Sequence, residues 1–249
     1  MSNYNYPDFN NYPQQSRQEP PSFFGSGAVQ KQTTSVMKRV YVRMFIGLLI
    51  SAFTALGVAS SPQAMMFFFG NKVVFWGMLI AMFAMAIIIP VRLMKMQSGT
   101  VLILFFIFSA LMGAWLAPIF YAYNPFTITK TFFITAGTFG AMSVYGYFTK
   151  TNLDKMGSYL MMALFGLIIL MLVNIFTQST AIEWIVSIVG LLIFIGLTAY
   201  DTQQVKRLAA ANLDPHLADK LATMGAMNLY LDFINLFLFL LRIFGGGRD

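Results

Sequence analysis

Long runs of apolar residues alternate with short polar connections from about residue 40 to the end of the chain. Each run is close to the roughly 20 residues that an α-helix needs to cross the hydrocarbon core of a bilayer. The connections carry turn formers such as Pro62, Asn124 and Pro125. The pattern therefore predicts an all-α integral membrane protein, a bundle of seven transmembrane helices at about 40–60, 73–94, 99–122, 127–148, 158–177, 182–205 and 222–244.

The composition agrees with a membrane protein and removes several kinds of chemistry. Of the 249 residues, 58% are hydrophobic and only 10% are charged, whereas soluble domains carry about 25% charged residues. The absence of cysteine excludes disulfides, thiolate metal sites and cysteine nucleophiles. The single histidine, His216, excludes zinc sites that need a pair of histidines. The sequence therefore predicts no catalytic residues and no cofactor.

The polar residues suggest how the chain is divided and oriented. Residues 1–35 are rich in Asn, Tyr, Pro, Gln and Ser, which predicts a disordered tail before a transmembrane domain of 36–245 and a short C-terminal end of 246–249. Eleven Lys and Arg residues fall on the side of the tail, against Lys72 and Lys130 on the other, which places the N-terminus in the cytoplasm. Because orientation in the membrane accounts for these basic residues, the net charge of +7 does not indicate a nucleic-acid partner, and none is predicted. Whether the last run crosses fully or re-enters is left open.

Two acidic residues lie inside apolar runs, Asp201 in the sixth and Asp232 in the seventh. A carboxylate at the centre of a spanning helix costs roughly 2.5 to 3.5 kcal/mol on insertion scales, so both should face a partner, water or an ion. Helical spacing places further polar residues on the same faces, and a hairpin through 206–220 can bring the two faces together. These supporting residues are Thr198 and Gln204 beside Asp201, and Asn228 and Asn235 beside Asp232.

A pair of carboxylates in a partly dry site has two uses. Both groups cannot ionise freely so close together, which makes such a pair sensitive to pH. The pair can also bind a hard cation such as Ca²⁺, with amide, hydroxyl or backbone oxygens as additional ligands. The alternative is structural, because a membrane aspartate can simply hydrogen-bond a neighbouring helix. Two aspartates on successive helices favour the functional interpretation.

Two cations close the second apolar run and have two explanations. Arg92 and Lys95 can extend their side chains to the membrane interface, as such residues commonly do. They can also form a latch, a cation that pairs with Asp201 or Asp232 and is released when the carboxylate is protonated.

The sequence around the aspartates resembles the Bax inhibitor family. The likeness rests on Ala199-Tyr-Asp-Thr-Gln203, on the segment 229–245 that begins Leu229-Tyr-Leu-Asp232, and on residues 143–150 and 156–166. It covers roughly residues 36–245 with order and spacing intact, and the N-terminal tail lies outside it. The short C-terminal end lacks the longer basic tail of animal members, which favours a bacterial plasma membrane over the endoplasmic reticulum.

This resemblance implies a fold, an activity and residue roles. It implies seven helices with the last one central, and a pH-sensitive Ca²⁺ leak in which Asp201 and Asp232 form the pore dyad. Ionised, the dyad holds the cytoplasmic half closed, and protonation loosens it. The latch arginine of some bacterial members falls on Lys95, with Arg92 about one turn earlier. This departure weakens the latch, because lysine lacks the bidentate fork of arginine.

Three functions remain to be compared. The first is the Ca²⁺ channel, whose partners are the lipid bilayer and the ion. The second is a non-conducting regulator that restrains a membrane protease or a cell-death partner, which implies a membrane-protein partner. The third is an intramembrane aspartyl protease, in which two carboxylates share a proton. Those enzymes carry Gly-x-Gly-Asp on the later helix, whereas Asp232 follows Leu229-Tyr-Leu, so an enzyme is not predicted.

Overall fold

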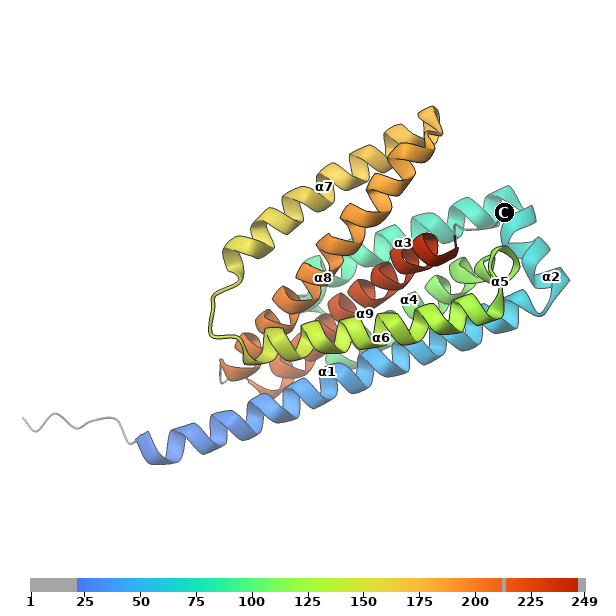
Figure 1. Cartoon of the computed structure of the whole chain (residues 1–249). Coiled ribbons are helices and arrows are strands. Elements are labelled where there is room, and N and C mark those ends of the chain that lie inside the picture. Colours follow the sequence, from blue (N-terminus) through green and yellow to red (C-terminus); the bar gives the residue numbers. More distant parts are fainter. Residues whose placement is uncertain (1–21, 212–213, 246–249) are drawn as a thin grey trace, which may run out of the picture.

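The computed structural model describes residues 22–211 and 214–245, and these form helices joined by short connections (Figure 1). Seven helices in this part of the chain are long. They are α1 (Ser22–Ala59), α3 (Lys72–Arg92), α4 (Ser98–Leu116), α6 (Pro125–Phe148), α7 (Asp154–Thr177), α8 (Thr180–Ala210) and α9 (Pro215–Gly245). Four short elements lie between them: α2 (Pro62–Met65), η2 (Met66–Gly70), η3 (Leu93–Lys95) and α5 (Ile119–Ala122).

Local side chains explain where several helices begin. Asn71 accepts from the backbone N–H of Val73 at 3.0 Å and caps α3, and Asn124 accepts from Phe126 at 2.9 Å and caps α6. Such caps satisfy backbone donors that the first helical turn leaves free. At the same end of the bundle, α7 stops at Gln178, whose φ of 46° lies in the left-handed region and breaks the helix.

Six helices are long and apolar enough to cross a membrane. They are α1, α3, α4 continued through α5, α7, α8 and α9, and they confirm the prediction of an all-helical membrane protein. Helix α6 has 24 residues but is not among the six. Its sequence mixes threonine and glycine with the apolar residues and carries Lys130 near its start, which lowers its hydropathy.

The predicted boundaries differ from the structure in three places. Helix α1 begins at Ser22, so residues 22–35 are helical and not part of a disordered tail, since no proline follows until Pro62. The run at 99–122 is two helices, because Pro118 lies between α4 and α5. Helix α9 begins at Pro215, two turns before the predicted start at 222. Residues 1–21 and 246–249 of the predicted ends lie outside the described residues.

Helix α9 is the most enclosed of the six candidate spans. Of its most apolar stretch 72% is buried, and it packs against α1, α4, α6 and α8 (Figure 1). Helix α7 shows the opposite environment, because only 6% of its stretch is buried and α8 is its main contact. Asp201 on α8 and Asp232 on α9 therefore lie on helices that are more buried than α7.

Buried hydrogen bonds tie α1, α4 and α9 together. The Ser51 Oγ lies 2.7 Å from the Ser109 carbonyl and 2.7 Å from the hydroxyl of Tyr230, which is fully buried. Close approach of the backbones supports this contact, since a Cβ added at Gly113 would lie 2.7 Å from the Ser51 Cα. Residues 47–59 of α1, which include small residues at a four-residue spacing, thus pack against α4.

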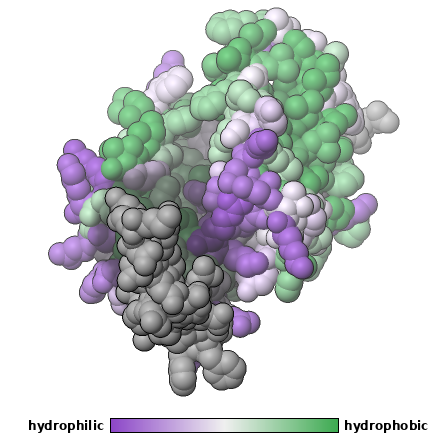
Figure 2. Space-filling view, turned by 90° about the vertical axis from the view of Figure 1, so that its left-hand side faces the viewer, coloured by the Kyte–Doolittle hydropathy of each residue, from purple (hydrophilic) through white to green (hydrophobic). Residues whose placement is uncertain are grey.

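The outer surface carries large apolar side chains on its flanks and a group of hydrophilic residues at the end seen in Figure 2. Large apolar side chains such as Phe53, Val73 and Phe176 are 71%, 81% and 88% exposed, as expected for residues that face lipid. Figure 2 shows hydrophilic residues gathered at the end of the molecule that carries the α8–α9 connection. We call this the α8–α9 end, and the end that carries residues 178–179 the opposite end.

Candidate functional site: a buried carboxylate pair

Two close contacts set how α8 and α9 lie against each other. A Cβ added at Gly225 of α9 would lie 2.7 Å from the Val205 Cγ2 of α8, and one added at Gly190 of α8 would lie 2.5 Å from the Phe239 Cε1. Glycine is required at both positions because these side chains occupy the space of a Cβ. In the antiparallel register that these contacts define, Asp232 lies opposite Thr198 and Asp201 lies about one turn away.

The structure brings Asp201 and Asp232 together, as the sequence predicts. Their side chains are 8% and 4% exposed, and each carboxyl group is the hydrogen-bonding neighbour of the other. A hydrogen bond between two carboxyl groups needs a proton on one of them, because an ionised carboxylate only accepts. The Asp232 Oδ2 is buried and has no hydrogen-bond partner among the described residues. The pair therefore has spare acceptor capacity for a proton or a cation.

Helix α6 closes one side of the pair. A Cβ added at Gly146 would lie 2.9 Å from the backbone Cα and carbonyl carbon of Ala199, two residues before Asp201. One turn of α6 earlier, Ser143 accepts a hydrogen bond of 3.4 Å from Thr202, and both side chains are buried. This part of α8 is thus held against α6 by a backbone contact and a hydrogen bond.

The predicted supporting residues behave differently from one another. Thr198 is fully buried at the level of Asp232, and its hydroxyl donates to the Phe194 carbonyl at 2.7 Å. Asn235 donates to the Leu231 carbonyl of its own helix at 2.8 Å, while Asn228 is partly exposed. The prediction for Gln204 is wrong, because its amide donates to Asp154 and to the Tyr200 hydroxyl, away from the pair. Helical spacing placed it about one turn from Asp201 but did not say which neighbour it binds.

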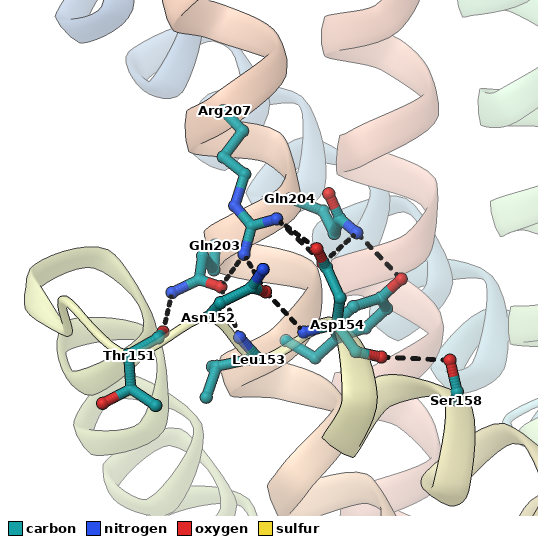
Figure 3. Close-up of polar contacts among 9 residues, drawn as sticks. Thr151, Asn152, Leu153, Asp154, Ser158, Gln203, Gln204 and Arg207 are labelled. Carbon is teal, nitrogen blue, oxygen red and sulfur yellow. Dashed lines mark hydrogen bonds and ion pairs between the residues drawn. The ribbon is translucent and has the colours of Figure 1, made fainter.

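A polar network holds the α6–α7 connection against α8 (Figure 3). Arg207 donates to both carboxylate oxygens of Asp154 at 2.8 Å and also donates to Gln203. Gln203 in turn accepts from the Leu153 N–H at 2.9 Å and donates to the Thr151 carbonyl at 2.8 Å. Because Gln203 follows Asp201 by two residues, this network restrains the rotation of α8 near the pair.

A second ion pair joins α1 to the start of α9, and sequence reasoning missed it. Arg39 and Arg43 lie 3.0 Å and 2.6 Å from the Asp219 Oδ1, and Arg43 also donates to Thr223 at 2.7 Å. The predicted helix 222–244 begins too late to include Asp219. The signal was available in the four-residue spacing of Arg39 and Arg43, which puts both on one helical face.

The family model described as Inhibitor of apoptosis-promoting Bax1 matches residues 33–249. The chain belongs to the Bax inhibitor family. It is 44% identical over 214 residues to the inner membrane protein YbhL of Escherichia coli, which covers 85% of this chain and 92% of that protein. It is equally similar to a protein of Borreliella burgdorferi, over 86% of this chain and 92% of the relative, and 38% identical to protein RP147 of Rickettsia prowazekii over 217 residues.

This family membership confirms the resemblance found in the sequence and identifies an integral membrane protein. The match begins at residue 33, inside α1, so it includes both carboxylates and the arginines that bind Asp219.

The two candidate latch cations lie away from the pair. Arg92 and Lys95 are exposed, and neither forms a salt bridge with the described residues. Their neighbour Met94 accepts a hydrogen bond of 3.3 Å from Lys220 near the start of α9. Lys220 precedes Asp232 by more than three turns, about 18 Å along the helix. The structure therefore does not bring the latch and the pair together.

The potential of the pair to bind metal rests on two carboxylates and neutral oxygens. Within residues 22–211 and 214–245, no three His, Cys, Asp or Glu side chains gather as a metal site. Ca²⁺ requires six to eight oxygen ligands, so two carboxylates alone leave most positions to hydroxyl, carbonyl or water oxygens. Such a site suits transient binding more than permanent retention.

Proposed function

We propose that this protein is a pH-sensitive Ca²⁺ leak channel whose path passes between α8 and α9 and is controlled by Asp201 and Asp232. The observation that supports this most directly is the contact of two buried carboxyl groups inside membrane-spanning helices, with the Asp232 Oδ2 unpartnered. A purely structural role would favour full hydrogen bonding, because an unsatisfied buried polar group costs free energy.

In this proposal, the protonation state of the two carboxyl groups controls whether the path between α8 and α9 is open. When both groups are ionised, their two negative charges attract a cation, and Thr198 and nearby carbonyls add oxygen ligands. The bound cation holds α8 against α9 and keeps the path closed. When the pair is protonated it loses this attraction, and the helices separate more easily. For Lys95 or Arg92 to act as a latch, α3 has to move inward. Helix α3 packs chiefly against α4 and η2, and only 17% of its spanning stretch is buried.

The proposal also assigns a topology. Helix α6 is the seventh span, because its 24 residues suffice to cross and it packs along α8 and α9. The enclosed α9 then lies at the centre of the bundle. The α8–α9 end, which gathers most of the Lys and Arg residues, faces the cytoplasm together with the N-terminus. The relative YbhL is named an inner membrane protein, and we assign this chain to a bacterial inner membrane as well.

Ion flux into liposomes, measured across pH, tests the channel. We expect Ca²⁺ flux through the native protein to change with pH and the flux through Asp201→Asn and Asp232→Asn to be nearly independent of it. The matched control is Asp214→Asn, which removes an exposed carboxylate in the α8–α9 connection and should leave the pH response intact. Native protein without flux at any pH contradicts the channel, and an Asp232→Asn variant with the native pH response contradicts the role of the pair.

The same preparations separate the other two functions. Cleavage of a model transmembrane peptide that is lost in Asp201→Ala would establish a protease, and we expect none. The family is described as an inhibitor of apoptosis-promoting Bax1, and this description keeps the regulator as the second candidate. For a regulator, deletion of residues 1–35 should abolish the cellular effect while the flux stays unchanged.

A further inference from the structure

The facing surfaces of α8 and α9 continue beyond the carboxylates toward the opposite end. On α9, Phe239 follows Asp232 by two turns, and on α8, Phe194 precedes Asp201 by two turns. Residues seven apart share a helical face, so both phenylalanines lie on the same faces as the carboxylates. The path between the helices is therefore polar at the pair and aromatic farther out.

Polar residues return at the opposite end of this path. A pocket of about 160 Å³ lies between the start of α8, the end of α9 and the end of α5. Its lining includes Glu183, Ser187 and Arg242. Ser187 precedes Phe194 by two turns and Arg242 follows Phe239 by about one turn. The pocket thus lies just beyond the two phenylalanines, on their far side from the carboxylates.

Along the two helices, the aromatic rings lie between the level of this pocket and the level of the pair. The rings of Phe194 and Phe239 stack with centroids 5.8 Å apart and are 6% and 4% exposed. Phe239 occupies the gap left by Gly190, where even a Cβ would lie 2.5 Å from its Cε1. On its outer side, the Arg242 guanidinium lies 5.9 Å from the ring centroid.

We propose that Phe194 and Phe239 form the hydrophobic constriction that separates the outer pocket from the carboxylate pair. This inference rests on the proposed channel for its function, but the barrier itself is a property of the fold. Apolar constrictions block ions because water, which hydrates the ion, leaves a narrow apolar space. Ions that enter the pocket then reach Asp232 only when α8 and α9 separate at the two rings.

Cysteine labelling tests the barrier without requiring any conduction. The chain contains no cysteine, so a single one can be introduced without background. In liposomes, a membrane-impermeant thiol reagent applied at the opposite end should label Thr180→Cys, because Thr180 is exposed and lines the pocket. It should not label Thr198→Cys beyond the rings, and adding Phe239→Ala should make that cysteine reactive. Equal labelling of Thr198→Cys with and without Phe239→Ala overturns the inference.

Flux measurements test whether the barrier limits conduction. We expect Phe239→Ala to raise Ca²⁺ flux under closed conditions at least about tenfold, which corresponds to lowering the barrier by about 1.4 kcal/mol. The matched control is Phe237→Ala on the same helix, because Phe237 lines an apolar groove beside α1 and α6 and not the α8 interface. If Phe239→Ala does not fold, Phe194→Ala removes the other ring.

The outcomes distinguish the two proposals. Unchanged flux in both ring variants, combined with a lost pH response in Asp232→Asn, overturns the constriction and leaves the channel standing. Absent flux in every variant overturns the channel, while the labelling still decides whether the rings form a barrier.

Discussion

The contact between α6 and α8 offers a sharp test of the packing around the carboxylates. Gly146→Ala adds one methyl group, which would lie 2.9 Å from the Ala199 Cα and carbonyl carbon and closer still to its carbonyl oxygen. Real Cβ contacts do not become this short, and the obstacle is backbone, which cannot rotate away. The two helices must therefore separate next to Asp201.

A second glycine of α6 provides a reference for the destabilisation expected from Gly146→Ala. Overpacking of a tight interior site costs about 1 to 3 kcal/mol. On the same helix, a Cβ added at Gly140 meets nothing within 4 Å, so Gly140→Ala brings no clash and improves helix propensity by up to about 1 kcal/mol. Both variants gain this propensity, so their free energies of unfolding should differ by the overpacking cost of roughly 1 to 3 kcal/mol although the chemical change is identical.

Thermal unfolding of the purified protein in one detergent measures this difference. For a chain of this size, a change of 1 kcal/mol shifts the Tm by about 2 to 4 °C. We expect Gly146→Ala to unfold at a lower temperature than the native protein and Gly140→Ala at the same or a slightly higher one. Equal Tm values for the two variants would refute the close approach of α6 and α8.

Two further predictions use the same unfolding measurement. In a double-mutant cycle, Ser51→Ala and Tyr230→Phe should show a coupling of about 0.6 kcal/mol, and at most about 1.7, as for hydrogen bonds between membrane helices; strictly additive losses would argue against the buried bond between the two hydroxyls. Asp219→Asn should cost about 1.5 to 3 kcal/mol because it removes the anion that Arg43 binds. Asp154→Asn should cost less, since its partner Arg207 and the carboxylate itself are 38% and 45% exposed; the reverse order would contradict this account.

The sequence predicted the carboxylate pair well because burial of charge is costly for each helix by itself. Asp201 and Asp232 are recognisable as acidic residues inside apolar runs without knowledge of how those runs pack, and both must turn inward. Gln204 was misassigned for the opposite reason, because a neutral amide near a helix end finds a partner at modest cost in any direction. Its partner, Asp154, lies 50 residues away in the sequence, and no local pattern links the two.

The boundaries that failed have similar causes. Asp219 and the start of α9 were placed in a loop because the polar residues at 214–220 interrupt the apolar pattern. In the structure, Arg43 on α1 compensates that polarity, so the helix continues through it. The end of a spanning helix is thus decided by contacts beyond the apolar run.

The lengths and spacing of the apolar runs by themselves determined that this chain is a helical membrane protein with two carboxylates at depth. These features depend on bilayer thickness and on the cost of placing charge in hydrocarbon, which act on each segment independently. Only the tertiary structure decided that the two carboxyl groups touch and that aromatic rings lie beyond them. That outcome depends on the register of α8 against α9, which Gly190 and Gly225 set by admitting Phe239 and Val205 where any larger residue would collide.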